Sequence, residues 1–226
     1  MNAAAEAPTA RPRPRGWPPV AALLLLSAIP LLGGTLRLLD LSGRTVAIET
    51  DPRFSAQPAP LVVHVLAAAV FATLGAVQFL PRLRRGKARY HRKAGRLALA
   101  AGLLTALSGL WMTLAYDLKP GSGSLLYVVR LAVSIGSGVA LVLAFRAIRR
   151  GDVGTHRAWM MRAYALGLGA GTQAFTQGFG EPLWGSGVLA HDLQLTAGWL
   201  INLAVAEAVI RRRSAPTRGA RPAAAA

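Results

Sequence analysis

The sequence predicts an all-α protein, a polytopic transmembrane helix bundle of about six spans, and three observations support this fold class. The chain of 226 residues is 53% hydrophobic and only 15% charged, whereas soluble domains carry roughly 25% charged residues. The mean hydropathy is +0.40. The stretches 54–81, 97–116 and 163–180 contain no Asp, Glu, Lys or Arg, and each is long enough to cross a bilayer.

The spans follow from the apolar segments, because about 20 such residues cross roughly 30 Å of hydrocarbon. They are predicted at 17–37, 60–80, 95–116, 125–146, 159–179 and 191–210, within one transmembrane domain over 17–212. The fourth span carries Arg130, and the sixth is bracketed by Asp192 and Glu207. The charged residues of these two spans need an internal partner or access to the membrane interface. The tails 1–16 and 213–226 are rich in Ala, Pro and Arg and are predicted to be disordered.

The orientation follows from the basic residues, because cytoplasmic connections of inner-membrane proteins are enriched in Lys and Arg. Of the 26 Lys and Arg residues, 21 fall in the two tails and in the connections after the second and fourth spans. We therefore expect a bacterial inner-membrane protein with an even number of spans and both termini in the cytoplasm. An alternative interpretation takes 11–34 as a cleaved signal peptide, which leaves five spans in the same orientation.

Several function classes are excluded by composition. The formal charge of +17 does not indicate nucleic-acid binding, because the basic residues lie at the ends of apolar segments. The absence of cysteine excludes disulfides and argues against iron–sulfur clusters and zinc ribbons. There is no G-x-S-x-G, Walker or HExxH sequence, and cytoplasmic acids are few. A hydrolase is therefore not expected, and any enzymatic role would be that of a membrane oxidoreductase component.

An internal repeat relates the two long basic connections. The segments 85–92 and 150–157 share the pattern R-G-x4-H-R at an offset of 65 residues. Each copy lies between two predicted spans, so spans two and three form one helical hairpin and spans four and five a second hairpin in the same orientation. Binding sites of membrane proteins often form between such repeats. His91 and His156 become equivalent residues.

The chain resembles a known family at a set of spaced positions. These are His64, Gly75, 78–81 (QFLP), His91 with Arg92, Gly95 with Arg96, and the block HRxWMxRxYAL at 156–166. They are similar to the bacterial predicted membrane proteins called domain of unknown function 2306, over residues 60–180. The resemblance implies the membrane fold and topology and no particular activity. Spans one and six, and His191, lie outside it.

The four histidines suggest haem binding, because imidazole is a common axial ligand of haem iron. A cytoplasmic site would use His91 and His156, and an outer site would use His64 and His191 with Arg130 as the partner of a propionate. Two such sites would form an electron path across the bilayer, with haem b as the cofactor and quinone as a partner. The alternative interpretation places these histidines at the lipid headgroup level.

A second interpretation replaces haem by an anion. The basic residues beside His91 and His156 could bind a phosphate, a lipid headgroup or quinone carbonyls at helix N-termini; they are Arg92, Arg96, Arg157 and Arg162. Under the haem hypothesis, the same four arginines would bind the propionates of the inner haem. Cytoplasmic enrichment in basic residues is the competing explanation for their presence.

Polar residues inside the spans raise two further alternatives. Arg130 either pairs with Asp117, Glu181 or Asp192 or contacts a substrate. The outer half of span five is polar at Thr172, Gln173, Thr176 and Gln177, which either line a cavity or bind Gln194 and Asn202 of span six. The small residues of three spans, Gly109 and Ser134 among them, indicate close helix packing.

Two function classes therefore remain open. One is a membrane-embedded binding or electron-transfer module that uses the paired histidines. The other is a small transporter, or a structural or assembly protein, with an anion or lipid-headgroup site and no redox cofactor. A homo-oligomer is compatible with both.

Overall fold

The computed structural model describes residues 17–46 and 48–214, so most of the two predicted tails lies outside the described residues. This part of the chain is helical, with turns and short connections and no strand. Its nine helices are α1 (Trp17–Leu41), α2 (Pro52–Ala56), α3 (Pro58–Gln78), α4 (Pro81–Gly86), α5 (Ala88–Ala115), α6 (Ser124–Arg149), α7 (Val153–Gly167), α8 (Gly169–Trp184) and α9 (Val188–Ser214).

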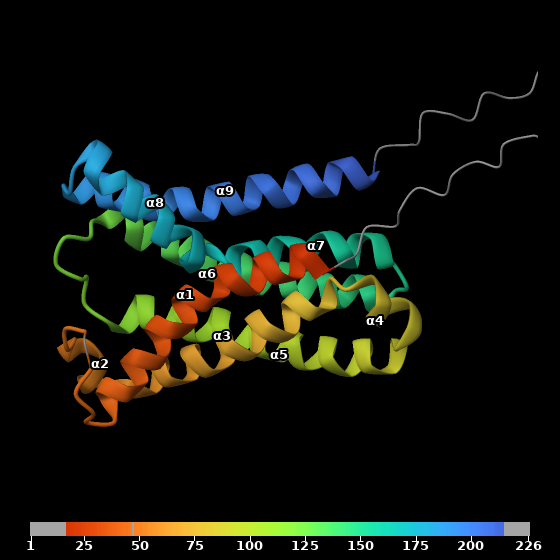
Figure 1. The fold of residues 1–226 in the computed structure, drawn as a ribbon, viewed down its shortest axis with the longest axis horizontal. Helices are drawn as coiled ribbons and strands as arrows, with labels where there is room; N and C mark the ends of the chain where they lie inside the picture. Colours follow the sequence, from red (N-terminus) through yellow and green to blue (C-terminus); the bar gives the residue numbers. More distant parts are fainter. Residues whose placement is uncertain (1–16, 47, 215–226) are drawn as a thin grey trace, which may run out of the picture.

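The long helices lie side by side along the long axis of the molecule (Figure 1). Five of them, α1, α3, α5, α6 and α9, are long and apolar enough to cross a membrane. One end of the bundle holds α4, the start of α1 and the end of α9, and the other holds α2 (Figure 1). We call these the α4 end and the α2 end. The all-α transmembrane bundle predicted from composition is confirmed.

The predicted span 159–179 is not one helix, because the chain breaks at Leu168 between α7 and α8. Glycines at 167, 169 and 171 weaken the helix there and let neighbours approach. A side chain at Gly169 would collide with the Trp199 ring, and one at Gly171 with the backbone oxygen of Leu26. The α7 segment occupies the half of the bundle nearer the α4 end, and α8 the other half (Figure 1).

Asn202 of α9 stabilises this break. Its Nδ2 donates a hydrogen bond of 3.2 Å to the backbone oxygen of Ala165, and its Oδ1 accepts one of 2.8 Å from the Thr172 hydroxyl. One side chain therefore bonds both halves of the broken helix. This arrangement is how membrane proteins tolerate irregular backbone, since water is not available to replace the lost bonds.

The two predicted hairpins are both packed helix pairs, α3 with α5 and α6 with α7. The repeated pattern places His91 and His156 at the same position, the fourth residue of α5 and of α7. Their backbone N–H groups make the first bonds of the two helices, to the oxygens of Lys87 at 3.0 Å and Asp152 at 3.1 Å. The repeat therefore marks two helix starts at one end of the bundle.

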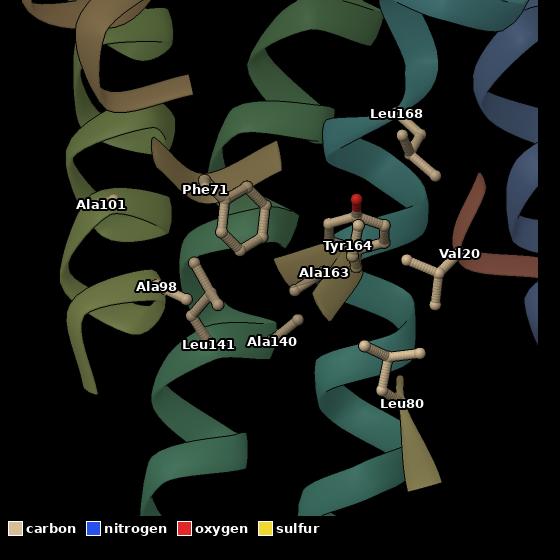
Figure 2. Close-up of a cluster of buried hydrophobic side chains, with 11 residues drawn as sticks. Val20, Phe71, Leu80, Ala98, Ala101, Ala140, Leu141, Ala163, Tyr164 and Leu168 are labelled. Atoms are coloured by element: carbon tan, nitrogen blue, oxygen red, sulfur yellow. The ribbon is translucent and has the colours of Figure 1, made fainter. Parts of the chain in front are cut away.

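The buried core lies where α3, α5, α6 and α7 meet. Figure 2 shows the ring of Phe71 beside that of Tyr164, with centroids 5.6 Å apart and an edge-on angle of 65°. The Tyr164 hydroxyl donates to the backbone oxygen of Ala72 at 2.7 Å. The ring lies directly over Gly75, where a Cβ would overlap it. Gly75 and Tyr164, both part of the family resemblance, thus contact each other.

Candidate ligand-binding cavity

A cavity of about 510 Å³ lies inside the bundle on the side of the core nearer the α2 end. Its lining includes Asp117 and Lys119 from the α5–α6 connection, and Phe71, Leu141 and Leu168 from the core cluster. Figure 2 shows Phe71 and Leu141 close to each other, with Leu168 on the other side of Tyr164. The cavity therefore runs from the α2 end of the bundle to the buried core, and its size lies within the range of small-molecule sites.

His64 of α3 lines this cavity. Its Nδ1 lies 3.1 Å from both the backbone oxygen of Thr105 and the hydroxyl oxygen of Ser108 on α5. The resemblance and the haem hypothesis both singled out this histidine. The ring is fixed against α5 by one nitrogen, while the other, Nε2, makes no hydrogen bond within the described part of the chain.

Three polar residues of α6 also line the cavity: Arg130, Ser134 and Ser137. Their spacing of four and three residues places them along one face of the helix. The hydroxyls of Ser134 and Ser137 make no hydrogen bond among the described residues. Serines inside helices usually bond the backbone oxygen four residues back, as Ser27 does to Leu23 at 2.8 Å.

Arg130 forms no ion pair with an acid of the described chain, although Asp192 was a predicted partner. Asp192 is 1% exposed, and its carboxylate instead accepts the backbone N–H groups of Gly123 at 2.9 Å and of Leu126 at 3.0 Å. These are the cap and the first turn of α6, where the helix dipole favours negative charge. Asp192 therefore stabilises the start of α6, and Arg130 has no carboxylate in contact.

Two basic residues at the α2 end of the cavity, Arg37 and Arg53, differ from Arg130 because they are paired. Arg53 bonds both Asp51 carboxylate oxygens, at 2.9 and 2.6 Å, and the backbone oxygen of Asp117 at 2.8 Å. These hydrogen bonds hold the pKa of Asp51 below its ordinary value. Arg37 lies 3.4 Å from Asp40 and donates to the backbone oxygen of Glu49 at 2.6 Å. These two arginines are thus paired with carboxylates of the protein, whereas Lys119 of the same lining forms no ion pair among the described residues.

The polar half of the fifth predicted span both lines the cavity and bonds to the sixth span, the two alternatives that the sequence left open. Gln173 lines the cavity, and its amide also donates to the backbone oxygen of Leu195 on α9 at 2.8 Å. Thr172 bonds Asn202 instead. Trp199 of α9 lies between the cavity and the helix break at Gly169.

The predicted histidine pairs lie on helices that do not pack extensively on each other in the described part. His91 is on α5 and His156 on α7, and α6 packs against both helices. The His156 Nδ1 contacts the backbone oxygen of Ala144 on α6 at 2.9 Å. His64 lines the cavity, whereas His191 on α9 does not and lies 3.5 Å from Asp192. Among the described residues, no three His, Cys, Asp or Glu side chains are grouped as a metal site requires.

The four arginines predicted to bind an anion are not all in the same kind of environment. Arg162 forms an ion pair with Glu207 of α9, with bonds of 2.5 and 3.0 Å, and its guanidinium lies 4.6 Å from the Trp159 ring. Arg92, Arg96 and Arg157 are exposed. A smaller cavity of about 270 Å³ near the α4 end is lined instead by Arg146 and Arg150, with Thr155 and Trp159.

Ser134 and Ser137 were both assigned to helix packing, and Trp199 was not among the predicted site residues. One signal could have identified the two serines: Arg130, Ser134 and Ser137 form a polar stripe at helical spacing on an otherwise apolar span. No comparable signal marks Trp199, because a tryptophan in a span more often packs or lies at the interface.

Comparison with known proteins supports the membrane assignment. A family model described as "Predicted membrane protein (DUF2306)" matches residues 61–210. No curated protein matches the chain, and no solved structure matches it. The match includes α3, from its fourth residue, through most of α9, and so covers most of the cavity walls.

Proposed function

We propose the following function for this chain, which belongs to the predicted membrane protein family DUF2306: it binds a small amphipathic anion in the cavity. The observation that carries the proposal is Arg130, a cation that lines a cavity inside the membrane bundle and contacts no acid within the described residues. The ligand would supply the missing negative charge as a carboxylate or a phosphate.

The cost of an unpaired arginine supports this proposal. Arg130 is the seventh residue of α6, which places it about 9 Å along the helix at 1.5 Å per residue. Charged side chains at such depth are unfavourable and are usually paired or used for function. Arg37 and Arg53, nearer the α2 end, have acidic partners, so the basic composition of the protein does not by itself explain Arg130.

The rest of the cavity suits an apolar body on that anion. Phe71, Leu141 and Leu168 close the inner end, and Met112 and Trp199 add apolar surface. Binding sites for small molecules combine such walls with a few polar groups that fix the orientation of the ligand. A short acyl chain with an acidic group would fill this space with its charge at Arg130.

The broken helix supports a transport or carrier role over an enzymatic one. The start of α8 lies inside the bundle, and Leu168 and Ala170 line the cavity. In transporters, discontinuous helices commonly form the substrate site, with the helix N-terminus toward an anionic group. The polar groups of the cavity, among them Arg130 and Ser134, are suited to holding a ligand by hydrogen bonds between apolar walls, and the proposed role is therefore binding and passage of the ligand.

A quinone is the second candidate, favoured by the unbonded Nε2 of His64 and the donors of Arg130 in one cavity. Both groups could bond quinone or quinol oxygens. Haem receives less support, since neither predicted histidine pair lies on one packed helix pair. Binding of ubiquinone with no competition from an anion would favour this second candidate.

The orientation proposed for the chain follows from its basic residues. We place the α4 end, with both termini, in the cytoplasm of a bacterial inner membrane, because the connections at that end carry most of the Lys and Arg residues. The cavity then lies toward the outer side. Arg146 and Arg150 at the α4 end suit anionic lipid headgroups.

The test is ligand binding to the purified protein in lipid nanodiscs, with decanoate, decyl phosphate and ubiquinone as probes. We expect decanoate or decyl phosphate to bind the wild type, and Arg130→Gln to weaken that binding about tenfold to a hundredfold, because a charge-assisted bond is worth roughly 1.5–3 kcal/mol. The matched control is Arg149→Gln at the other end of α6, where the side chain is exposed. Equal binding by all three proteins, or no binding of either anion, would refute the proposal.

A further inference from the structure

The hydrogen bonds of His64 determine which of its nitrogens carries a proton. The backbone oxygen of Thr105 can only accept a hydrogen bond. The Ser108 hydroxyl has one proton, which it donates to the backbone oxygen of Leu104 at 2.6 Å, so its oxygen also acts as an acceptor toward His64. Nδ1 lies 3.1 Å from both acceptors. Nδ1 therefore carries the proton, and in the neutral ring Nε2 is a hydrogen-bond acceptor.

The space in front of this ring is kept open by a glycine. A Cβ added at Gly109 would lie 3.4 Å from Cε1 of His64 and 3.3 Å from Oγ of Ser134. Gly109 of α5 thus faces both His64 of α3 and Ser134 of α6 and contributes no side chain there. Ser134 lies one helical turn from Arg130 on the same face of α6, with Cβ atoms about 5–6 Å apart in that arrangement.

These groups have complementary hydrogen-bonding needs. Arg130 only donates, Nε2 of neutral His64 only accepts, and the hydroxyls of Ser134 and Ser137 can do either. All four residues line one cavity. A plain fatty acid would satisfy Arg130 and leave the histidine acceptor unpaired. Sites that bond a polar group of the ligand reject analogues lacking that group.

We propose that the ligand is an amphipathic acid that also carries a hydrogen-bond donor, a hydroxyl or an N–H group, on its apolar body. The acidic group binds Arg130, and the donor binds Nε2 of His64. The acidic group and the donor therefore occupy different positions along the apolar body of the ligand. This inference rests on the proposed function and specifies its ligand class.

The experiment compares decanoate with a series of hydroxydecanoates whose hydroxyl lies progressively farther from the carboxyl group. The readout is the ratio of the two affinities, measured by calorimetry on the wild-type protein in nanodiscs. We expect one hydroxylated acid to bind about threefold to tenfold more tightly than decanoate, the range that one neutral hydrogen bond supplies. No preference for any hydroxylated acid would overturn the inference.

The informative variant is His64→Asn. The asparagine amide nitrogen is as many bonds from the backbone as Nδ1, so it retains the donor to Thr105 and removes the acceptor at Nε2. We expect the preference for the hydroxylated acid to be lost. A preference that persists in this variant would overturn the role of His64. Should the variant fail to fold, the affinity ratios of the wild-type protein for the hydroxydecanoate series still decide the inference.

Failure of this inference differs visibly from failure of the proposed function. If decanoate binds through Arg130 with no preference for a hydroxyl, the anion site stands and the ligand class proposed here is wrong. If neither acid binds, the proposed function fails first. Arg149→Gln serves again as the control, with the affinity ratio of the wild type expected.

Discussion

Replacing Arg130 by methionine separates a structural role for this residue from a ligand-binding role. If Arg130 serves to bind a ligand, the ligand-free protein contains an uncompensated charge. Removing that charge should stabilise the fold. A centrally placed arginine costs about 2.5–3.5 kcal/mol in membrane insertion. Because Arg130 lies nearer a helix end, beside a cavity with polar walls, we expect a gain of about 1–2 kcal/mol, or roughly 2–8 °C in melting temperature.

The assay is thermal unfolding of ligand-free protein in detergent, followed by tryptophan fluorescence. Arg149→Met is the matched control, since this exposed side chain at the opposite end of α6 should change stability by less than about 0.5 kcal/mol. The reasoning would be refuted by a loss of more than about 1 kcal/mol in Arg130→Met. That result would mean that Arg130 is paired structurally, as removing one member of an ion pair leaves the other charge buried.

Three further predictions test the topology, the helix contacts and the charges at the α2 end. The chain has no cysteine, so in intact cells an impermeant maleimide should label Lys119→Cys and spare Arg149→Cys; the reverse pattern would invert the orientation. Gly171→Ala should destabilise the protein by about 1–3 kcal/mol, because its methyl group meets α1, whereas Gly33→Ala has open space and should be neutral or stabilising. The pKa of Asp51 is lowered in the folded protein, so the ionised carboxylate adds to the free energy of unfolding above pH 3.8. This stabilisation is lost as the pH falls through the folded-state pKa. The unfolding midpoint of Asp51→Asn should therefore lack the decrease that the wild type shows at acid pH.

The helices could be predicted from the sequence because each long apolar run has only one stable form in a bilayer, in which all backbone groups are bonded internally. The repeated R-G-x4-H-R pattern also located two equivalent helix starts, since His91 and His156 each occupy the fourth helical position. Both predictions depend on residues close together in the chain, where spacing along a helix determines the geometry.

The break at Leu168, and the finding that Arg130 has no acidic partner among the described residues, could not be predicted in the same way. Glycines in a membrane helix are as compatible with close packing as with a break, and Trp199 and Asn202 decide between these from another helix. Asp192 lies at the same end of the bundle as Arg130, but its carboxylate is used by the amides that begin α6. Such choices depend on which helix faces meet, and the spacing of residues in one sequence does not specify that.

Some polar residues of the bundle bond other parts of the protein, and others line the cavity without a partner in the described chain. Stability measurements can separate these two classes. Asn202 bonds the two halves of a broken helix, so Asn202→Leu should leave a backbone oxygen and a hydroxyl unpaired and lower the stability by about 1–2 kcal/mol. Ser137 lines the cavity and bonds nothing in the described protein, so Ser137→Ala should leave the stability of the ligand-free protein within about 0.5 kcal/mol. If both variants lost stability equally, the cavity hydroxyls would belong to the packing of the fold, and the argument that they await a ligand would fail.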